Sequence, residues 1–327
     1  MAGMGKRMRP HTLTVPKPLI PVAGKPIVQH LMEDIISVCP EKVDEMAFVV
    51  GRFGKEVEDT LVKIASSLGA KGTIHYQDEP LGTAHAILCA NSALTGKVVV
   101  AFADTLFRSE ANIDPNSDGT IWVKQIEDPR QFGVVKVNKD NVITDFVEKP
   151  VEFVSDLAII GIYYFKDGEN LKSELQYLID NNIRDKGEYQ LTNAMENMKT
   201  KGKILVPGKV IEWLDCGNKD ATVYTNGRML EIKYPEGKIS ATAKITNSVI
   251  NQPCFIADGV VIQNSVVGPN VSIGDKTKIT GSIISQTIIQ KSSTINNAAI
   301  TNSMIGSSCV YTGKADDLSM GDFSTQV

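Results

Sequence analysis

The chain has 327 residues, a length that exceeds one compact core and fits two domains. Hydrophobic residues make up 42% and charged residues 22%, which is typical of a globular protein and excludes wholesale disorder. The net charge of −4 gives no electrostatic basis for nucleic acid or a membrane as the main partner, and no apolar run approaches the ~18 residues that span a bilayer.

The amino-terminal segment combines glycines with fixed positive charge. The stretch Gly3–Pro10, called the glycine loop below, contains Arg7, and Pro16–Leu19 adds Lys17. Glycines let backbone N–H groups approach a polyanion closely, and the two cations add to the attraction. The loop lacks the Gly-Lys-Ser/Thr of a Walker A motif, and Met8 stands where a dinucleotide fingerprint needs its third glycine. It predicts a phosphate-binding loop of another kind, with an ordinary turn as the alternative.

Strands alternate with helices from this loop to about residue 228. The runs Met46–Val50 and Val98–Phe102 are continuously apolar, like strands buried on both faces of a parallel sheet. Helical patterns cover Ile27–Val38 and Thr83–Leu94. This alternation predicts an α/β layer fold with a ligand crevice at the carboxyl ends of its strands.

The composition changes near Gly237. Residues 238–313 contain 21 Ile and Val but no Leu, Glu or Arg, which favours strands over helices. Asn247–Ile250 returns after 17 residues as Asn264–Val267 and after 17 more as Gly281–Ile284, with aliphatic residues every five or six positions. Three such steps per turn predict a prism of short parallel strands. A β-sandwich, the alternative, would need longer inside-outside alternation and wider turn spacing.

The expected organisation is therefore a first domain over residues 1–228, a linker over 229–237, the repeat domain over 238–313 and a polar tail over 314–327. The five cysteines lie far apart without a C-x-x-C pair, which predicts reduced thiols in a cytoplasmic protein. The repeat domain has charge-poor Ile/Val faces, and these predict homo-oligomerisation.

The string from the glycine loop to Pro26 resembles the signature of the sugar-phosphate nucleotidylyltransferases, G-x-G-x-R-x-x-P followed by P-K-P-L and G-K-P. The repeat domain resembles the hexapeptide-repeat, left-handed β-helix family, and its left hand is implied by that resemblance alone. Together the resemblances cover essentially the whole chain. They imply a Rossmann-like domain with a mixed, mostly parallel sheet, followed by a left-handed parallel β-helix. Further segments match the first family in order: Gln77–Ala84, Asp104, Phe132–Val135, Val147–Pro150, Ala158–Tyr163, Gly187–Thr192 and Trp213–Gly217.

The resemblance implies transfer of a nucleoside monophosphate from a nucleoside triphosphate to a sugar-1-phosphate, with release of pyrophosphate. The thymidylyltransferase branch that uses dTTP and glucose-1-phosphate fits best, and UTP- or GTP-dependent branches of UDP-glucose or GDP-mannose type are the alternatives. A bifunctional acyltransferase is a rival, but such enzymes rely on a histidine of the β-helix, and all four histidines lie at or before His85. A non-catalytic regulatory homologue is a second rival, which the retained charged residues oppose.

Roles for individual residues are likewise implied by the resemblance. Arg7 and Lys17 would be catalytic. Mg²⁺ would be bound by Asp104 and Asp215. Nucleotide binding falls to Ala2, Gly3, Gln77 and Gly82, and sugar-phosphate binding to Gly133, Glu148, Lys149 and Tyr163. Blander alternatives are a turn or cap role for Asp104, an exposed charge pair for Glu148 and Lys149, a core position for Tyr163, and a helix-start cap for Glu188 and Thr192.

One departure from the family pattern concerns the start of the chain. In the family a buried strand runs directly into the glycine loop, whereas here Met1 already stands in the loop. Neighbouring strands would then keep unpaired backbone groups, at a cost of ~1–3 kcal/mol each. We expect a start upstream of Met1, or a truncated form. About five to seven added apolar residues should then raise stability and tighten nucleotide binding.

Overall fold

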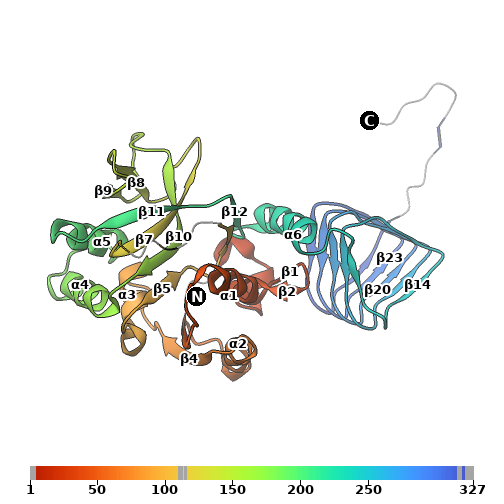
Figure 1. The fold of residues 1–327 in the computed structure, drawn as a ribbon. Coiled ribbons are helices and arrows are strands. Elements are labelled where there is room, and N and C mark those ends of the chain that lie inside the picture. Colours follow the sequence, from red (N-terminus) through yellow and green to blue (C-terminus); the bar gives the residue numbers. More distant parts are fainter. Residues whose placement is uncertain (1–4, 110–112, 114–115, 315–318, 321–327) are drawn as a thin grey trace. The chain divides into compact units, whose positions relative to one another are not determined.

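The computed structural model describes residues 5–109, 113, 116–314 and 319–320 (Figure 1). The chain divides into two compact units. The first comprises Met1–Ile20 with Lys25–Gly217, and the second comprises Pro21–Gly24 with Asn218–Val327. Within the described residues, no helix is both long and apolar enough to cross a membrane.

The first unit is an α/β layer structure, as predicted. Its helices are α1 (Ile27–Val38), α2 (Lys55–Ser67), α3 (Thr83–Leu88), α4 (Gly168–Asp180) and α5 (Leu191–Thr200). Short 3₁₀ turns are η1 (Lys6–Met8), η2 (His11–Leu13), η3 (Lys17–Leu19) and η4 (Asn91–Ala93). Its strands are β2 (Lys25–Pro26), β3 (Glu45–Val50), β4 (Lys71–Tyr76), β5 (Val98–Ala101), β6 (Thr105–Arg108), β7 (Gly119–Gln125), β8 (Val134–Val137), β9 (Ile143–Val147), β10 (Leu157–Phe165), β11 (Leu205–Lys209) and β12 (Glu212–Asp215).

The predicted helices and strands form for the expected reasons. α1 buries Ile27, Val28 and Leu31 along one face, the spacing of an amphipathic helix. α4 begins after Asp167, whose carboxylate accepts the Asn170 N–H at 2.8 Å, a standard amino-terminal cap. The helix predicted over 83–94 is shorter than expected: α3 ends at its sixth residue, and the 3₁₀ turn η4 follows.

β10 organises the main sheet. It pairs with β7 on one side and with β5 and β8 on the other, all antiparallel, while β9 joins β8 and β11 lies parallel to β7. β3 and β4 form a separate parallel pair. The mixed sheet is confirmed, but within this unit antiparallel ladders outnumber parallel ones, in contrast to the mostly parallel sheet expected. A continuous apolar run reports burial on both faces and carries no information about strand direction.

The main hydrophobic core lies between this sheet and α3, α4 and α5 (Figure 1). A second core packs α1 and α2 against β3. Because both cores fix the strand ends, they also fix the loops that follow those strands, where the predicted site residues lie.

The second unit is a parallel β-solenoid of about four turns, which confirms the repeat interpretation. Its strands are β1 (Pro21–Val22), which lies outside the solenoid, and β13 (Lys238–Ile239), β14 (Lys244–Thr246), β15 (Val249–Ile250), β16 (Cys254–Ile256), β17 (Val261–Gln263), β18 (Val266–Val267), β19 (Val271–Ile273), β20 (Lys278–Thr280), β21 (Ile283–Ile284), β22 (Thr287–Ile289), β23 (Thr294–Asn296), β24 (Ala299–Ile300), β25 (Ser303–Ile305) and β26 (Val310–Thr312). Every third strand stacks in register, which gives three parallel faces: β13-β16-β19-β22-β25, β14-β17-β20-β23-β26 and β15-β18-β21-β24.

Inward aliphatic ladders and left-handed corner residues hold the solenoid together. Ile262, Ile279 and Ile295 lie opposite one another in successive turns and are fully buried. At one corner Asn247 and Asn264 adopt positive φ angles of 47° and 51°, and the Asn247 amide donates to the Asn264 side chain at 2.7 Å. Asn tolerates this conformation better than most residues, so the repeat of Asn and Gly at this corner follows from the turn geometry.

The boundary between the units differs from the predicted one. Helix α6 (Lys219–Lys233) belongs to the second unit and runs into the expected linker over 229–237. It packs against β19, β22 and β25 of the solenoid (Figure 1). Its fully buried Asn226 accepts the Ser272 hydroxyl at 2.6 Å and the Ala23 N–H at 2.9 Å. Because several of the buried residues of α6 are polar, its sequence lacks the apolar stripe by which a packed helix is usually recognised.

The inward ladder yields a stability prediction. Ile279→Ala should leave a cavity that the stacked neighbouring turns cannot fill, and lower the free energy of unfolding by ~2–5 kcal/mol. Lys278→Ala, exposed on the same strand, is the control and should change it by less than ~0.5 kcal/mol. Urea denaturation of the full chain measures both, and equal midpoints for the two variants would contradict the ladder's contribution.

Candidate active site

Two aspartates from distant parts of the chain meet at one point of the first unit. Asp104 directly precedes β6, and Asp215 is the last residue of β12. The two strands pair antiparallel with Asp215 opposite Thr105, and the Cys216 N–H donates to the Asp104 carbonyl at 3.0 Å. Backbone hydrogen bonds therefore bring together the two predicted metal ligands.

Cations surround this pair. The Lys17 ammonium donates to the Asp104 carboxylate at 2.9 Å, and the Lys17 side chain is only 10% exposed. Burial raises the pKa of Asp215; Lys17 and Arg7 oppose that shift, and the nearby charge of Asp104 adds to it. Two cations from the amino-terminal segment, Lys17 and Arg7, thus offset the repulsion between the two carboxylates.

Gly217 allows this close approach, and it was absent from the predicted site residues. Its N–H donates to the Asp215 carboxylate at 2.9 Å. A Cβ at this position would lie 2.8 Å from Asp215 Oδ2 and 3.2 Å from Arg7 Nη2, so a side chain would displace one of the two. The sequence signal was the glycine two residues after the aspartate, inside the Trp213–Gly217 motif.

The donor set at this point fits Mg²⁺. The described residues contain no cluster of three or more His, Cys, Asp or Glu side chains placed to hold a metal. Mg²⁺ requires fewer: it binds through one or two carboxylates and completes its octahedron with water and phosphate oxygens. Asp104 and Asp215 would supply those two carboxylates. A structural zinc or calcium site would require more protein ligands than this.

The segment that follows β4 forms the second part of the site. The Gln77 amide donates to the Gly82 carbonyl at 3.1 Å and lies 3.2 Å from His85 Nδ1. Gly82 directly precedes α3 with φ +114°, a conformation that favours glycine. The two predicted nucleotide-binding residues are therefore held together by a direct hydrogen bond.

This segment packs against the Gly187–Thr192 motif. The Tyr189 N–H donates to the Leu81 carbonyl at 2.8 Å, and the Ala84 N–H donates to the Tyr189 carbonyl at 2.9 Å. A Cβ on Gly82 would lie 2.5 Å from the Tyr189 oxygen. Two motifs that are a hundred residues apart thus interlock through backbone atoms, and only glycine fits between them.

The third part of the site lies where β8, β9 and α5 meet. Glu148 is mostly buried, accepts the Thr192 hydroxyl at 3.4 Å and lies near Gly133, whose added Cβ would be 3.1 Å from its Oε2. Lys149 has φ 43°, unusual for a lysine, and its side chain is 54% exposed, with Nζ 3.7 Å from Glu148 Oε1. The Lys149 side chain is exposed, whereas the Glu148 side chain is mostly buried. The two residues therefore do not form the exposed charge pair that the sequence left open as an alternative.

Aromatic packing connects these parts. Tyr163 is buried against Phe102 and Phe165, with ring centroids 5.7 and 6.4 Å away, and burial raises its pKa with a smaller contribution from the charge of Glu148. This is the core position that the sequence left open as an alternative to a sugar contact. Phe132 and Trp213 stack edge-to-face at 4.9 Å and join the Gly133 loop to the strand that carries Asp215. Ala2 and Gly3 lie outside the described residues.

The chain is similar to several known proteins. Residues 1–231 match the family described as Nucleotidyl transferase. The chain is 30% identical over 330 residues to a glucose-1-phosphate thymidylyltransferase of Streptomyces antibioticus, covering 93% of this chain and 90% of that one. It is 29% identical over 342 residues to the bifunctional protein GlmU of Methanococcus maripaludis, covering 95% and 77%. A nucleoside-diphosphate-sugar pyrophosphorylase of Vibrio cholerae shares the fold with a TM-score of 0.60, 20% identity, and coverage of 69% of this chain and 97% of that one.

The contact between Gly82 and Tyr189 yields a prediction. Gly82→Ala should lower the free energy of unfolding by at least ~2 kcal/mol, because the strained backbone and the clash with Tyr189 add together. Gly187→Ala is a matched control, with φ +86° but open space around the added methyl, and should cost only ~1 kcal/mol. Thermal unfolding of both variants measures the difference, and equal losses would show that the clash is relieved without cost.

Proposed function

Because this chain belongs to the nucleotidyl transferase family, we propose that it transfers a nucleoside monophosphate from a nucleoside triphosphate to a sugar-1-phosphate. The products are a nucleoside diphosphate sugar and pyrophosphate. The observation that carries this proposal is the convergence of Arg7, Lys17, Asp104 and Asp215 on one point of the first unit.

The reaction requires two anions to meet. Two like unit charges about 4 Å apart repel by ~1 kcal/mol in water and ~4 kcal/mol at an effective dielectric of about 20. An oxygen of the sugar phosphate forms a bond to the α-phosphorus while the bond to the pyrophosphate oxygen breaks, so negative charge moves onto pyrophosphate. Positioning and charge neutralisation supply most of the catalysis of such a transfer.

The cations of the site match this demand. Lys17 would neutralise the α-phosphate, and Arg7 would stabilise the charge that develops on the leaving pyrophosphate. The guanidinium of Arg7 lies beside Gly217 and acts on the charge of Asp215, so it already points toward the carboxylate pair. Mg²⁺ held by Asp104 and Asp215 would supply further neutralisation of phosphate charge.

The remaining residues would select the substrates. Gln77 and the Gly82 backbone would contact the base, and Glu148 and the Gly133 backbone would contact sugar hydroxyls. Lys149 would bind the incoming sugar phosphate, which agrees with its exposed ammonium. Its positive φ costs ~1–2 kcal/mol, and such strain often occurs at ligand sites.

For the substrates we propose dTTP and glucose-1-phosphate. Support comes from the relative whose printed name is glucose-1-phosphate thymidylyltransferase, which the chain matches over nine tenths of its length. UTP- and GTP-dependent transfer are the alternatives, since a few amide and backbone contacts determine the base. Pyrophosphate release with four nucleotides against a panel of sugar-1-phosphates tests the choice, and no release with any pair would contradict the activity itself.

Acyl transfer is the rival activity that the resemblance of the repeat domain raised. We do not assign it, because residues 86–327 contain no histidine to act as its base.

The carboxylate pair gives the first activity prediction. Asp104→Asn and Asp215→Asn should each remove at least ~90% of turnover with Mg²⁺, since each amide is a much poorer ligand for a hard cation. Both variants should stay folded, and removal of a buried like charge favours this for Asp215. Asp140→Asn, exposed in the β8–β9 turn, is the control. Wild-type rates in either site variant would overturn the metal assignment.

Lys149 gives the second activity prediction. Lys149→Ala should raise the KM for sugar-1-phosphate ~10-fold or more with little change in the KM for nucleotide, because this side chain would meet only the incoming phosphate. Lys139→Ala, an exposed lysine of the β8–β9 turn, should change neither value. A defect confined to the nucleotide KM would place Lys149 on the other substrate.

We further propose that the solenoid forms a homo-oligomer through its β15-β18-β21-β24 face. Val249, Val266, Ile283 and Ala299 stand opposite one another there and form an outward apolar ladder, with Val249 and Ile283 more than half exposed. The face of β13 to β25 is partly covered by α6, and the face of β14 to β26 carries lysines and polar residues. Soluble proteins usually bury such an apolar face against a partner.

A single charge tests this face. Ile283→Lys should lower the mass per particle measured by light scattering, because a lysine in the centre of an apolar interface loses its hydration. Val310→Lys, at an apolar position on the β14-to-β26 face that is also more than half exposed, should leave the mass unchanged. If Val310→Lys dissociates the particle and Ile283→Lys does not, the interface lies on the other face.

A further inference from the structure

The chain passes between its two units at three points, and the first and last of these adjoin predicted site residues. Pro21–Gly24, a short segment of the second unit, begins four residues after Lys17. The last passage follows Gly217, and α6 begins four residues after Asp215. Segments of the second unit therefore continue the chain directly from a cation and from a carboxylate of the candidate site.

Lys17 lies in a tight turn that ends where this short segment begins. The Ile20 N–H donates to the Lys17 carbonyl at 3.1 Å, and the Leu19 N–H donates to the Pro16 carbonyl at 2.9 Å. Ile20 is also fully buried. A 3₁₀ turn closed by such hydrogen bonds moves as one piece, so a shift at Pro21 would be passed on to Lys17.

Asn226 of α6 anchors Pro21–Gly24 within the second unit. Its side-chain oxygen accepts the Ala23 N–H at 2.9 Å, and its amide donates to the Asn270 carbonyl at 3.3 Å. The same oxygen accepts the Ser272 hydroxyl at 2.6 Å. Asn226 is fully buried, where polar groups without partners are strongly unfavourable, so these three contacts fix its carboxamide in one orientation.

The anchored segment is held against its own backbone preference. Ala23 has φ 45°, in the left-handed region that disfavours alanine. Such conformations persist only where the surrounding structure holds them. At the next residue, a Cβ on Gly24 would lie 2.3 Å from the Phe255 ring, so the backbone lies directly against that ring. The second unit thus holds this segment through a buried hydrogen bond and through close packing.

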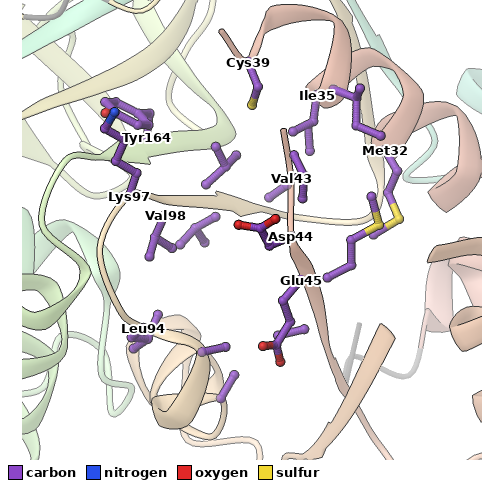
Figure 2. Close-up of a pocket in the computed structure, with 18 of the residues that line it drawn as sticks. Met32, Ile35, Cys39, Val43, Asp44, Glu45, Leu94, Lys97, Val98 and Tyr164 are labelled. Carbon is purple, nitrogen blue, oxygen red and sulfur yellow. The ribbon is translucent and has the colours of Figure 1, made fainter. Parts of the chain in front are cut away.

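The ion pair with Asp104 gives Lys17 weaker support. Residues 98–103, which lead to Asp104, line a cavity of about 690 Å³ together with β3 and α1 (Figure 2). Segments with few packed neighbours have low local stability. The Asp104 side chain is also 44% exposed. The position of Lys17 therefore depends more on the anchored segment that follows it than on its ion-pair partner.

We propose that Asn226 is a positioning residue for Lys17. It holds Pro21–Gly24 to the second unit and thereby keeps the Lys17 ammonium beside Asp104. Because α6 also continues the chain from Asp215, one helix governs the position of a cation and of a carboxylate. The effect on turnover rests on the proposed function, whereas the mobility of Lys17 can be measured without it.

Asn226→Ala and Ser272→Ala in the full chain form a matched pair. Both remove the hydrogen bond between these two side chains, but only Asn226→Ala also releases Ala23. Labelling of Lys17 by acetic anhydride, read by mass spectrometry and normalised to the ion-paired Lys201, reports how firmly the ammonium is held. Steady-state kinetics with both substrates and urea unfolding are measured on the same samples.

Asn226→Ala should speed the labelling of Lys17 at least ~5-fold and lower kcat ~10-fold or more, because a small displacement of a catalytic group slows the reaction strongly. Both KM values should change less than kcat, since the side chains assigned to bind the substrates are unaltered. Ser272→Ala should change neither the labelling nor kcat, even where its unfolding midpoint is lower.

Gly24→Ala displaces the same segment from its other side, through the clash with Phe255, and should also speed the labelling of Lys17. It decides the question if Asn226→Ala does not fold. Labelling of Lys17 no faster in these variants than in Ser272→Ala would overturn the positioning role, as would an equal loss of kcat in Ser272→Ala. If the labelling responds as expected but the wild-type chain transfers no nucleotide, the positioning role is supported and only the proposed function fails.

Discussion

The first unit depends on holding two carboxylates close together. Burial raises the pKa of Asp215, and the nearby negative charge of Asp104 raises it further. The β6–β12 ladder and the hydrogen bond between Cys216 and Asp104 hold the pair by backbone atoms alone, so their spacing does not rely on flexible side chains. The cations of the amino-terminal segment then offset the repulsion, which couples that segment to the site electrostatically.

The substrate-selecting parts are positioned by close backbone approach. Gly82 against Tyr189, and Gly217 between Asp215 and Arg7, leave no room for a side chain. Glycine contributes here through its small size, and at Gly82 also through its positive φ. Because these contacts join segments far apart in sequence, one added methyl is expected to disturb two parts of the site at once.

The same unit combines a well-packed core with strands that have no partner on one edge among the described residues. β10 is buried along almost its whole length, whereas among the described residues β3 pairs only with β4 and β5 pairs only with β10. Such an edge is a region of low local stability, since few buried contacts and unpaired backbone groups protect it. β5 leads along the chain to Asp104, so the order of this strand affects the position of the Asp104 carboxylate.

Sequence alone determined the elements whose signal is local or periodic. The solenoid follows from its 17-residue aliphatic repeat, α1 from its amphipathic spacing, and the site segments from motifs that can be read without knowing what they touch. Tertiary structure decided what depends on partners: the antiparallel directions around β10, the place of α6 on the solenoid, the burial of Tyr163 in the core and the need for glycine at position 217. The physical reason is that an apolar residue carries a free energy of burial but no direction. Strand order, crowding and the pKa of a buried group exist only once distant segments have met.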